Sequence, residues 1–174
     1  MPARPGADHP SAGTFRPLGR GASGCIASGV EPETAAHDVV IVGVDGTPSS
    51  IAALRWAARQ AELTGATLRV VTTWAFPATV GWTPPYPDDF DPEADARSVQ
   101  GEAVAEALGN DPKVPLDLVV VEGHASAALI EMSHEASLLV VGCRGHGAVT
   151  GILVGSVSEH VVCHAGCPVV VVRH

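Results

Sequence analysis

The sequence predicts an α/β fold: an open, doubly wound, Rossmann-like sheet of five parallel strands with helices on both faces. The first observation is a set of short β-branched runs, the clearest being VVIVGV at 39–44, LLVVG at 138–142 and PVVVV at 168–172. The second is that longer stretches with apolar residues at helical spacing separate these runs. The third is composition, since 46% hydrophobic and 17% charged residues in a chain of 174 describe one compact domain.

The first half of the domain is expected to begin with a strand over 38–45 that leads into the sequence GTPSS. Thr47 can cap the helix that follows and Pro48 suits its first turn, while Gly65 is a typical helix end. A second strand is expected over 67–74 because its residues are mostly β-branched.

The remaining elements follow the same alternation after a long loop. The segment 76–92 contains five prolines, which exclude regular structure and predict a surface loop. Beyond it we expect helices over 93–108, 126–134 and 157–164, and strands over 116–121, 138–142 and 169–172.

The ends and the overall charge restrict the setting of this domain. Residues 1–36 are rich in Gly, Pro, Ala and Ser without apolar periodicity, so we expect a disordered tail before a domain over 37–174. No apolar run approaches the roughly 20 residues of a membrane helix, and no secretory signal is visible. We therefore expect a cytoplasmic protein that does not contact membranes. A net charge of −9 and a single lysine, Lys113, argue against binding to nucleic acid.

The segment 140–162 carries five glycines between a predicted strand and a predicted helix. Gly142 and Gly145 let backbone N–H groups approach an anion, while Gly155 and Ser156 start a helix whose first N–H groups are unpaired. This spacing is typical of phosphate binding. A looser spacing of glycines in the same segment resembles a dinucleotide fingerprint, but such a fingerprint belongs after the first strand and connects directly to its helix.

Two turns are expected to meet at one edge of the sheet. In doubly wound sheets ligands bind at the carboxyl ends of the strands, where the strand order reverses. The GVDGT turn at 43–47 follows the first strand, and the glycine segment follows the fourth. We therefore expect these two segments to face each other.

Three stretches resemble the universal stress protein family. They are VGVDGTPSS at 42–50, the pattern G-x2-G-x9-G-S at 142–156 and CPVVVVR at 167–173, and the resemblance covers about 37–173. It implies an adenine nucleotide alpha hydrolase-like fold. Because the glycine pattern is intact, as in the members that bind nucleotide, the resemblance also implies ATP binding.

The resemblance assigns roles to single residues. It implies that Asp45 accepts hydrogen bonds from the ribose hydroxyls, that Gly43 lies beside the nucleotide and that Thr73 contacts the adenine side. Arg144 and His146 lie within the loop and would supply positive charge, with bound Mg2+ offsetting the rest. The residues that would hold the phosphates are Gly142, Gly145, Gly155, Ser156 and the Val157 amide.

Several of these residues also fit a purely structural role. Asp45 can organise the turn into the first helix. Ser156 and Glu159 form an S-x-x-E pattern, in which Ser156 caps its own helix in the empty protein and donates to phosphate in the complex. Arg144 can equally be a solvated surface residue.

The sequence HVVCHAGC at 160–167 contains four potential zinc ligands. Helical spacing places His160, Cys163 and His164 close together, but Cys167 lies beyond the helix break. Packing and surface roles therefore explain these residues better than a metal site does.

The chain has no G-x4-G-K-[ST], the phosphate-binding motif of many ATP-hydrolysing enzymes, and no G-x-S-x-G, the motif of a serine hydrolase. The sequence thus favours a nucleotide-dependent regulator in the stress response with slow hydrolysis at most and an unidentified protein partner. The resemblance further implies a homodimer through the strand at 168–172. The alternatives are a nucleotide-independent scaffold and a Cys/His redox or metal sensor. Asp45→Ala and Gly142→Ala are expected to weaken ATP binding while leaving the fold largely intact.

Overall fold

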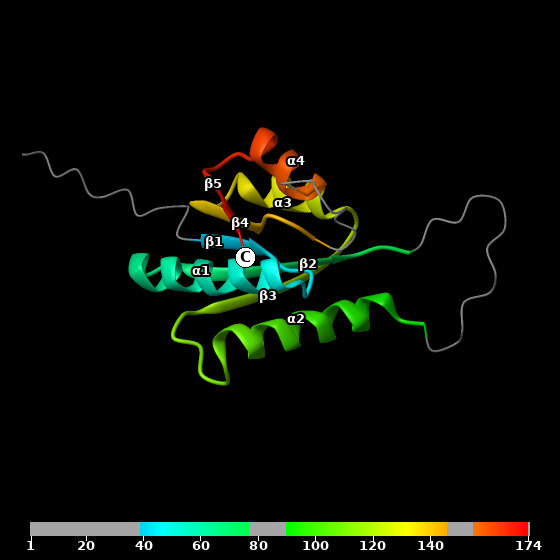
Figure 1. The fold of residues 1–174 in the computed structure, drawn as a ribbon, viewed down its shortest axis with the longest axis horizontal. Helices are drawn as coiled ribbons and strands as arrows, with labels where there is room; N and C mark the ends of the chain where they lie inside the picture. Colours follow the sequence, from blue (N-terminus) through cyan, green and yellow to red (C-terminus); the bar gives the residue numbers. More distant parts are fainter. Residues whose placement is uncertain (1–38, 77–89, 146–154, 174) are drawn as a thin grey trace, which may run out of the picture. The chain divides into compact units, whose positions relative to one another are not determined.

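The computed structural model describes residues 39–76, 90–145 and 155–173, and it has the predicted α/β architecture. Strands and helices alternate strictly along these residues (Figure 1). In chain order the elements are β1 (Val39–Gly43), α1 (Pro48–Thr64), β2 (Thr67–Trp74), α2 (Pro92–Leu108), β3 (Leu116–Glu122), α3 (Ala125–Ser133), β4 (Leu138–Gly142), α4 (Ser156–His164) and β5 (Val169–Val172).

The five strands form one parallel sheet in the order β3-β2-β1-β4-β5. The chain moves outward from β1 through β2 to β3, and then returns to β4 on the other side of β1. The order therefore reverses between β1 and β4, which is where open sheets of this kind bind ligands. Both predicted site segments follow these two strands.

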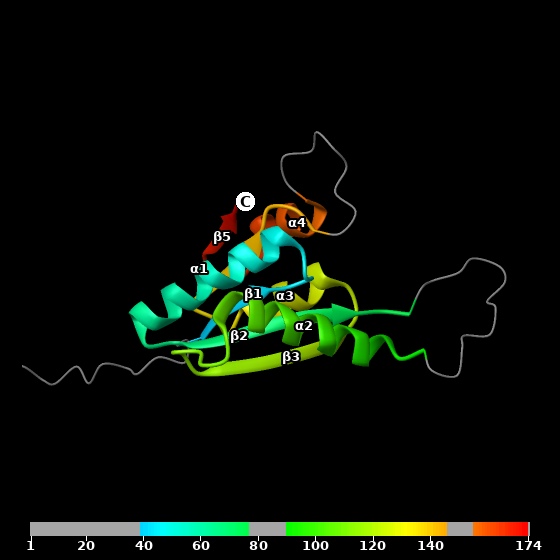
Figure 2. The same ribbon diagram turned by 60° about the horizontal axis from the view of Figure 1, so that its bottom comes forward.

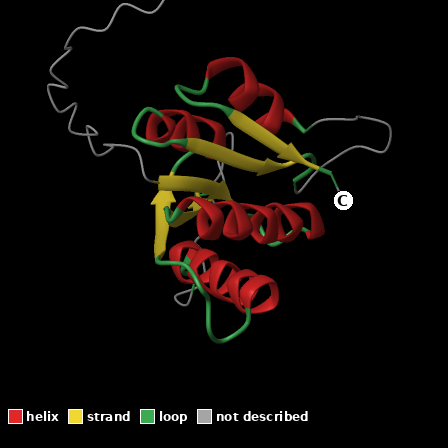
Figure 3. Cartoon of the chain, turned by 90° about the vertical axis from the view of Figure 1, so that its left-hand side faces the viewer, coloured by secondary structure: helices red, strands yellow, loops and turns green. Residues whose placement is uncertain are grey.

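Two pairs of helices cover the sheet. The helices α1 and α2 pack side by side on one face, and α3 and α4 pack on the other (Figures 1 and 2). Figure 3 shows the sheet between these two layers. Because side chains alternate along a strand, Val40 and Val42 enter the core beneath α1 and α2, whereas Ile41 enters the core beneath α3 and α4.

The first helix begins and ends as its sequence predicts. The Thr47 hydroxyl accepts a hydrogen bond from Ser50 N at 3.3 Å, and Pro48 occupies the first turn. Gly65 ends the helix in the left-handed conformation, with φ 71°. The strand expected over 38–45 is shorter than predicted, because the chain leaves the sheet after Gly43 and turns toward α1. Among the described residues, no helix is long and apolar enough to cross a membrane.

Two predictions fall on residues that the structure does not describe. The tail expected over 1–36 lies outside the described residues, as does most of the proline-rich loop expected over 76–92. The boundaries of the predicted domain over 37–174 therefore stay a prediction.

Candidate functional site

The turn after β1 is held by hydrogen bonds around Asp45. Its Oδ1 accepts from Thr47 N at 3.1 Å and from Thr47 Oγ1 at 2.6 Å. Asp45 N donates to Ser50 Oγ at 3.3 Å, and that hydroxyl donates to Thr47 O at 2.9 Å. The structural role expected for Asp45, the organisation of this turn, is thus present in the structure.

The segment after β4 lies against this turn, which confirms that the two meet. The carbonyl oxygen of Arg144 accepts hydrogen bonds from Ser49 Oγ and, at 3.4 Å, from Thr47 Oγ1. Gly145 lies so close to the turn that a Cβ atom added to it would stand 2.7 Å from Asp45 Oδ2. A side chain at position 145 would have to displace this carboxylate, so glycine permits the close approach in its present geometry.

Gly142 has a packing reason that the sequence analysis did not recognise. A Cβ atom at this position would lie 2.7 Å from the backbone carbon of Ser49 and 2.8 Å from its carbonyl oxygen. Backbone atoms in the first turn of α1 cannot move aside as a flexible side chain can. Gly142 thus permits β4 and α1 to pack together. A substitution at Gly142 would therefore change packing as well as any ligand contact, which the expectation for Gly142→Ala did not include.

The start of α4 differs from the predicted capping box. The helix begins at Ser156, and its N-cap is Gly155, whose carbonyl accepts from Glu159 N at 2.9 Å. In the part of the chain that the structure describes, no side chain caps this helix, so the interpretation of Ser156 as its own cap is wrong. Gly155 N donates to Cys143 O at 2.8 Å, which joins the helix start to the end of β4.

The first turn of α4 has one buried, hydrogen-bonded side chain and two exposed ones. Ser158 is buried, and its hydroxyl donates to Gly142 O at 2.9 Å. Ser156 and Val157 are exposed on the same turn. Backbone N–H groups in the first turn of a helix have no partner within the helix. The residues predicted to bind phosphate therefore surround a helix start whose first N–H groups have no partner within the helix.

Four other predicted residues complete the set. Gly43 ends β1, while Thr73 is half-buried on β2, opposite Val121 of β3, where no hydrogen bond joins its side chain to the turn. Arg144 is exposed, and no carboxylate among the described residues forms an ion pair with it. His146 lies outside the described residues.

The neighbour of Thr73 contacts the turn instead. Thr72 is 4% exposed, and its hydroxyl donates to Val44 O at 3.0 Å. Sequence analysis missed Thr72 as well as Ser49, which bonds the glycine segment. Successive side chains of a strand point to opposite faces of the sheet, so Thr72 and Thr73 lie on different faces. This alternation was the sequence signal that could have identified Thr72.

The histidines and cysteines near the C-terminus do not assemble as metal ligands usually do. Within the described ranges, no three His, Cys, Asp or Glu side chains are grouped so that they could hold a metal ion. The rings of His160 and His164 lie 4.4 Å apart between centroids on exposed positions of α4. Cys143 is buried beside the glycine segment, and burial raises the pKa of the Cys167 thiol although a backbone hydrogen bond from Leu139 lowers it.

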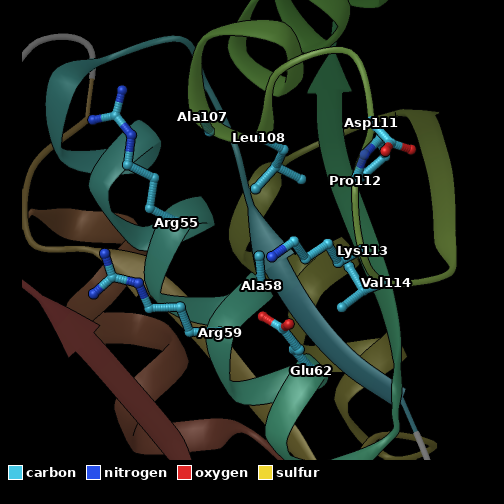
Figure 4. A pocket seen from close by; sticks show the side chains of 10 residues that line it. All are labelled: Arg55, Ala58, Arg59, Glu62, Ala107, Leu108, Asp111, Pro112, Lys113 and Val114. Atoms are coloured by element: carbon cyan, nitrogen blue, oxygen red, sulfur yellow. The ribbon is translucent and has the colours of Figure 1, made fainter.

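A cavity of about 290 Å³ lies at the opposite end of α1. Figure 4 shows Arg55 and Arg59 extending from α1, and Lys113 reaching toward that helix from the segment before β3. Glu62 and Asp111 line the same cavity and offset part of this positive charge. Since neither predicted site segment reaches the cavity, it is separate from the candidate site.

The structure therefore brings a bonded acidic turn and an uncapped helix start together at the carboxyl edge of β1 and β4. The profile of the universal stress protein family matches residues 37–173, almost all of the predicted domain. The chain belongs to the universal stress protein family.

Curated relatives are similar over one half of their length. Universal stress protein Rv2005c of Mycobacterium tuberculosis is 39% identical over 141 residues, which cover 77% of this chain and 47% of the relative. Rv2623 of the same organism is 36% identical over 145 residues, with the same two coverages. The chain thus spans about half the length of these universal stress proteins.

Solved universal stress proteins share the fold. UspA from Lactobacillus plantarum superposes with a TM-score of 0.63 at 21% identity, covering 78% of this chain and 97% of its own. A universal stress protein solved in complex with cAMP has a TM-score of 0.57 at 26% identity, covering 80% and 98%. One from Archaeoglobus fulgidus, solved in complex with dAMP, has a TM-score of 0.52 at 20% identity, covering 76% and 95%.

Proposed function

We propose that this universal stress protein binds an adenine nucleotide, ATP with Mg2+, at the carboxyl edge of β1 and β4 and acts as a nucleotide-dependent regulator. The observation that carries the proposal is the approach of Gly145 to the Asp45 carboxylate, with the open start of α4 on the same segment. A similar universal stress protein was solved with cAMP and another with dAMP, which supports an adenine nucleotide as the ligand.

In this proposal Asp45 binds the ribose. The two hydrogen bonds from Thr47 to Oδ1 orient the carboxylate before any ligand arrives. An oriented acceptor loses little conformational entropy on binding. Gly43 would lie beside the nucleotide, and Thr73 would approach the adenine from the end of β2.

The phosphates would be held at the start of α4. Unpaired N–H groups and the positive end of the helix dipole favour an anion there. No lysine among the described residues lies on either site segment, so Arg144, His146 and Mg2+ would balance the charge of the triphosphate. Hydroxyl and phosphate oxygens are the hard ligands that Mg2+ takes, and Ser156 supplies an exposed hydroxyl. The residues that would hold the phosphates are Gly142, Gly145, Gly155, Ser156 and Val157.

The proposal assigns regulation to the protein and at most slow hydrolysis. Phosphoryl transfer requires groups that position an attacking water and stabilise transferred charge. The turn around Asp45 commits its hydroxyls to backbone atoms and to Asp45 itself. We further propose that the cytoplasm is its location and that an unidentified protein partner reads the nucleotide state. A nucleotide-independent scaffold of the same fold is the alternative.

The proposed homodimer would pair β5 with its copy in a second chain. β5 bonds only to β4 on the sheet, and its four valines are half-buried. Exposed edge strands of this kind are prone to pair with other chains. Mass measurement at micromolar concentration should give a dimer, and a strictly monomeric mass would exclude it.

The first experiment is mass spectrometry of small molecules released by denaturing freshly purified protein, followed by calorimetric titration with ATP and Mg2+. Near-stoichiometric ATP and a heat of binding are expected. Asp45→Asn is the sharper variant, because the amide oxygen can still accept from Thr47 while the charge is lost. Binding should weaken in this variant. No nucleotide and no heat with wild-type protein would leave the scaffold as the function.

A further inference from the structure

Gln100 of α2 is a buried polar side chain that the proposed site does not use. It is 3% exposed. Its amide nitrogen donates its two hydrogens to Val70 O and Val119 O, both at 3.0 Å, and shares one of them with Thr72 Oγ1 at 3.4 Å. A buried amide costs free energy unless it is hydrogen-bonded, so an apolar residue would fill this position more simply. The positions of the three acceptors, on β2 and β3, therefore indicate which parts of the structure Gln100 holds together.

The third acceptor, Thr72, is itself hydrogen-bonded to the turn that carries Asp45. The hydroxyl of Thr72 donates to Val44 O at 3.0 Å, and Val44 N donates to Val71 O at 2.9 Å. β2 thus holds both polar backbone groups of the residue that precedes Asp45. Because Gln100 bonds to Thr72, α2 is joined to this peptide by a chain of two side chains.

The helix α2 also contacts the turn beyond Asp45. Gly46 has φ +80°, and a Cβ atom added to it would lie 2.9 Å from Val99 Cγ1. Val99 of α2 therefore packs against the backbone of Gly46. Residues 99 and 100 act on the two sides of Asp45, one by packing and one through Thr72.

We propose that α2 positions the Asp45 turn through Gln100 and Val99, so that a shift of α2 changes the nucleotide affinity of the site. The link to affinity rests on the proposed function, whereas the effect on the turn does not. Coupling of this kind is reciprocal, so a bound nucleotide would also steady α2. A protein partner that contacts α2 would then sense, and alter, the occupancy of the site.

The effect on the turn is tested without nucleotide by hydrogen exchange of the amides at 44–47. Thr72→Val and Gln100→Met remove donors while keeping similar volumes. Ser133→Ala is the control, because Ser133 is 0% exposed and its hydroxyl bonds to Ile130 O and Gly166 N in the opposite core. Comparison with this control separates a local effect from a general loss of stability.

Both variants should speed exchange at 44–47 relative to Ser133→Ala, and Thr72→Ser, which keeps the hydroxyl, should restore the wild-type rate. Unchanged exchange at the turn in both variants would overturn the positioning role. The same outcome follows if Ser133→Ala accelerates the turn equally, because the effect would then be global.

Titration with ATP and Mg2+ tests the link to the site. Loss of one hydrogen bond in the chain should weaken binding by up to about tenfold. Ser133→Ala should bind as wild type does, and ATP should slow exchange in α2 of the wild-type protein. Equal affinity in all variants would overturn the coupling. Failure of the wild type to bind would reject the proposed function, and the exchange of the empty turn would still decide the positioning role.

Discussion

The two halves of the candidate site differ in how completely their polar groups are used. The turn after β1 has its side chains bonded to one another and to α1, with Asp45 and Thr47 at the centre. The start of α4 has a glycine at its cap position, and no side chain among the described residues caps its first backbone N–H groups. One half is therefore built in the absence of ligand, and the other keeps donors open. Substitution of Thr47 in the first half should therefore mainly change stability, and substitution of the exposed Ser156 in the second half should mainly change binding.

The largest effect is expected from Gly142→Ala, because the added methyl group would disrupt the packing of β4 against α1, which holds the two halves together. The added methyl would lie 2.7 Å from backbone atoms of Ser49, and forcing it in should lower the free energy of unfolding by about 1–3 kcal/mol. Urea denaturation measures this change. Gly101→Ala is the matched control, because nothing lies within 4 Å of a Cβ there, and removing an exposed helical glycine should raise stability by about 0.5–1 kcal/mol. Equal effects of the two substitutions would contradict the packing role.

Removal of the helix cap in the first half should have the next largest effect. Thr47→Ala deletes the acceptor of Ser50 N and a hydrogen bond to Asp45, so the free energy of unfolding should fall by about 1 kcal/mol. Thr47→Ser keeps the hydroxyl and should restore most of this loss. If Thr47→Ala is as stable as wild type, the turn is not preformed as the structure indicates.

In the second half, Ser156→Ala should separate binding from stability. Since Ser156 caps nothing, its loss should change the free energy of unfolding by less than about 0.5 kcal/mol while weakening ATP binding several-fold. Ser158→Ala on the same turn removes a buried bond to Gly142 O and should cost about 1 kcal/mol. Denaturation and calorimetry of the pair decide the point. A large loss of stability in Ser156→Ala would revive the capping box.

The smallest effect concerns pH and lies away from both halves. Burial raises the pKa of the Cys167 thiol above its usual value of 9.0, so the folded state favours the neutral thiol. The stabilisation is fully present below pH 9.0, the unfolded value, and is lost as pH rises through the folded value. Cys167→Ser should therefore have a shallower loss of stability as the pH rises above 9.0, measured by urea denaturation. Identical slopes would contradict the raised pKa.

The fold was predictable because each element carries its own local signal. Thr47, Pro48 and Gly65 mark the ends of α1, and the valine runs mark the buried strands. The meeting of the two site segments was predictable because both follow the carboxyl ends of parallel strands. Helix ends and buried strands depend on interactions between residues close in sequence, and the alternation of these elements restricts the topology. Both can be read from a single sequence.

Details of the site were harder to predict because they depend on contacts between distant residues. The sequence alone does not show that Gly142 faces the backbone of Ser49, or that Gly155 takes the cap position before Ser156. The polar chain from Gln100 to Val44 spans three elements and has no motif. Such features become visible only once the three-dimensional packing shows which faces of the helices and strands are in contact.

The joint between the two halves is made to the carbonyl oxygen of Arg144 and not to its side chain. Every amino acid has a backbone carbonyl oxygen, so Ser49 and Thr47 could donate the same hydrogen bonds to a different residue at this position. The exposed side chain is therefore open to evolutionary tuning: a basic, neutral or acidic residue there would alter the charge offered to an anion without loosening the architecture. Under the proposed function, nucleotide preference would diverge at position 144 while the scaffold around it stays the same.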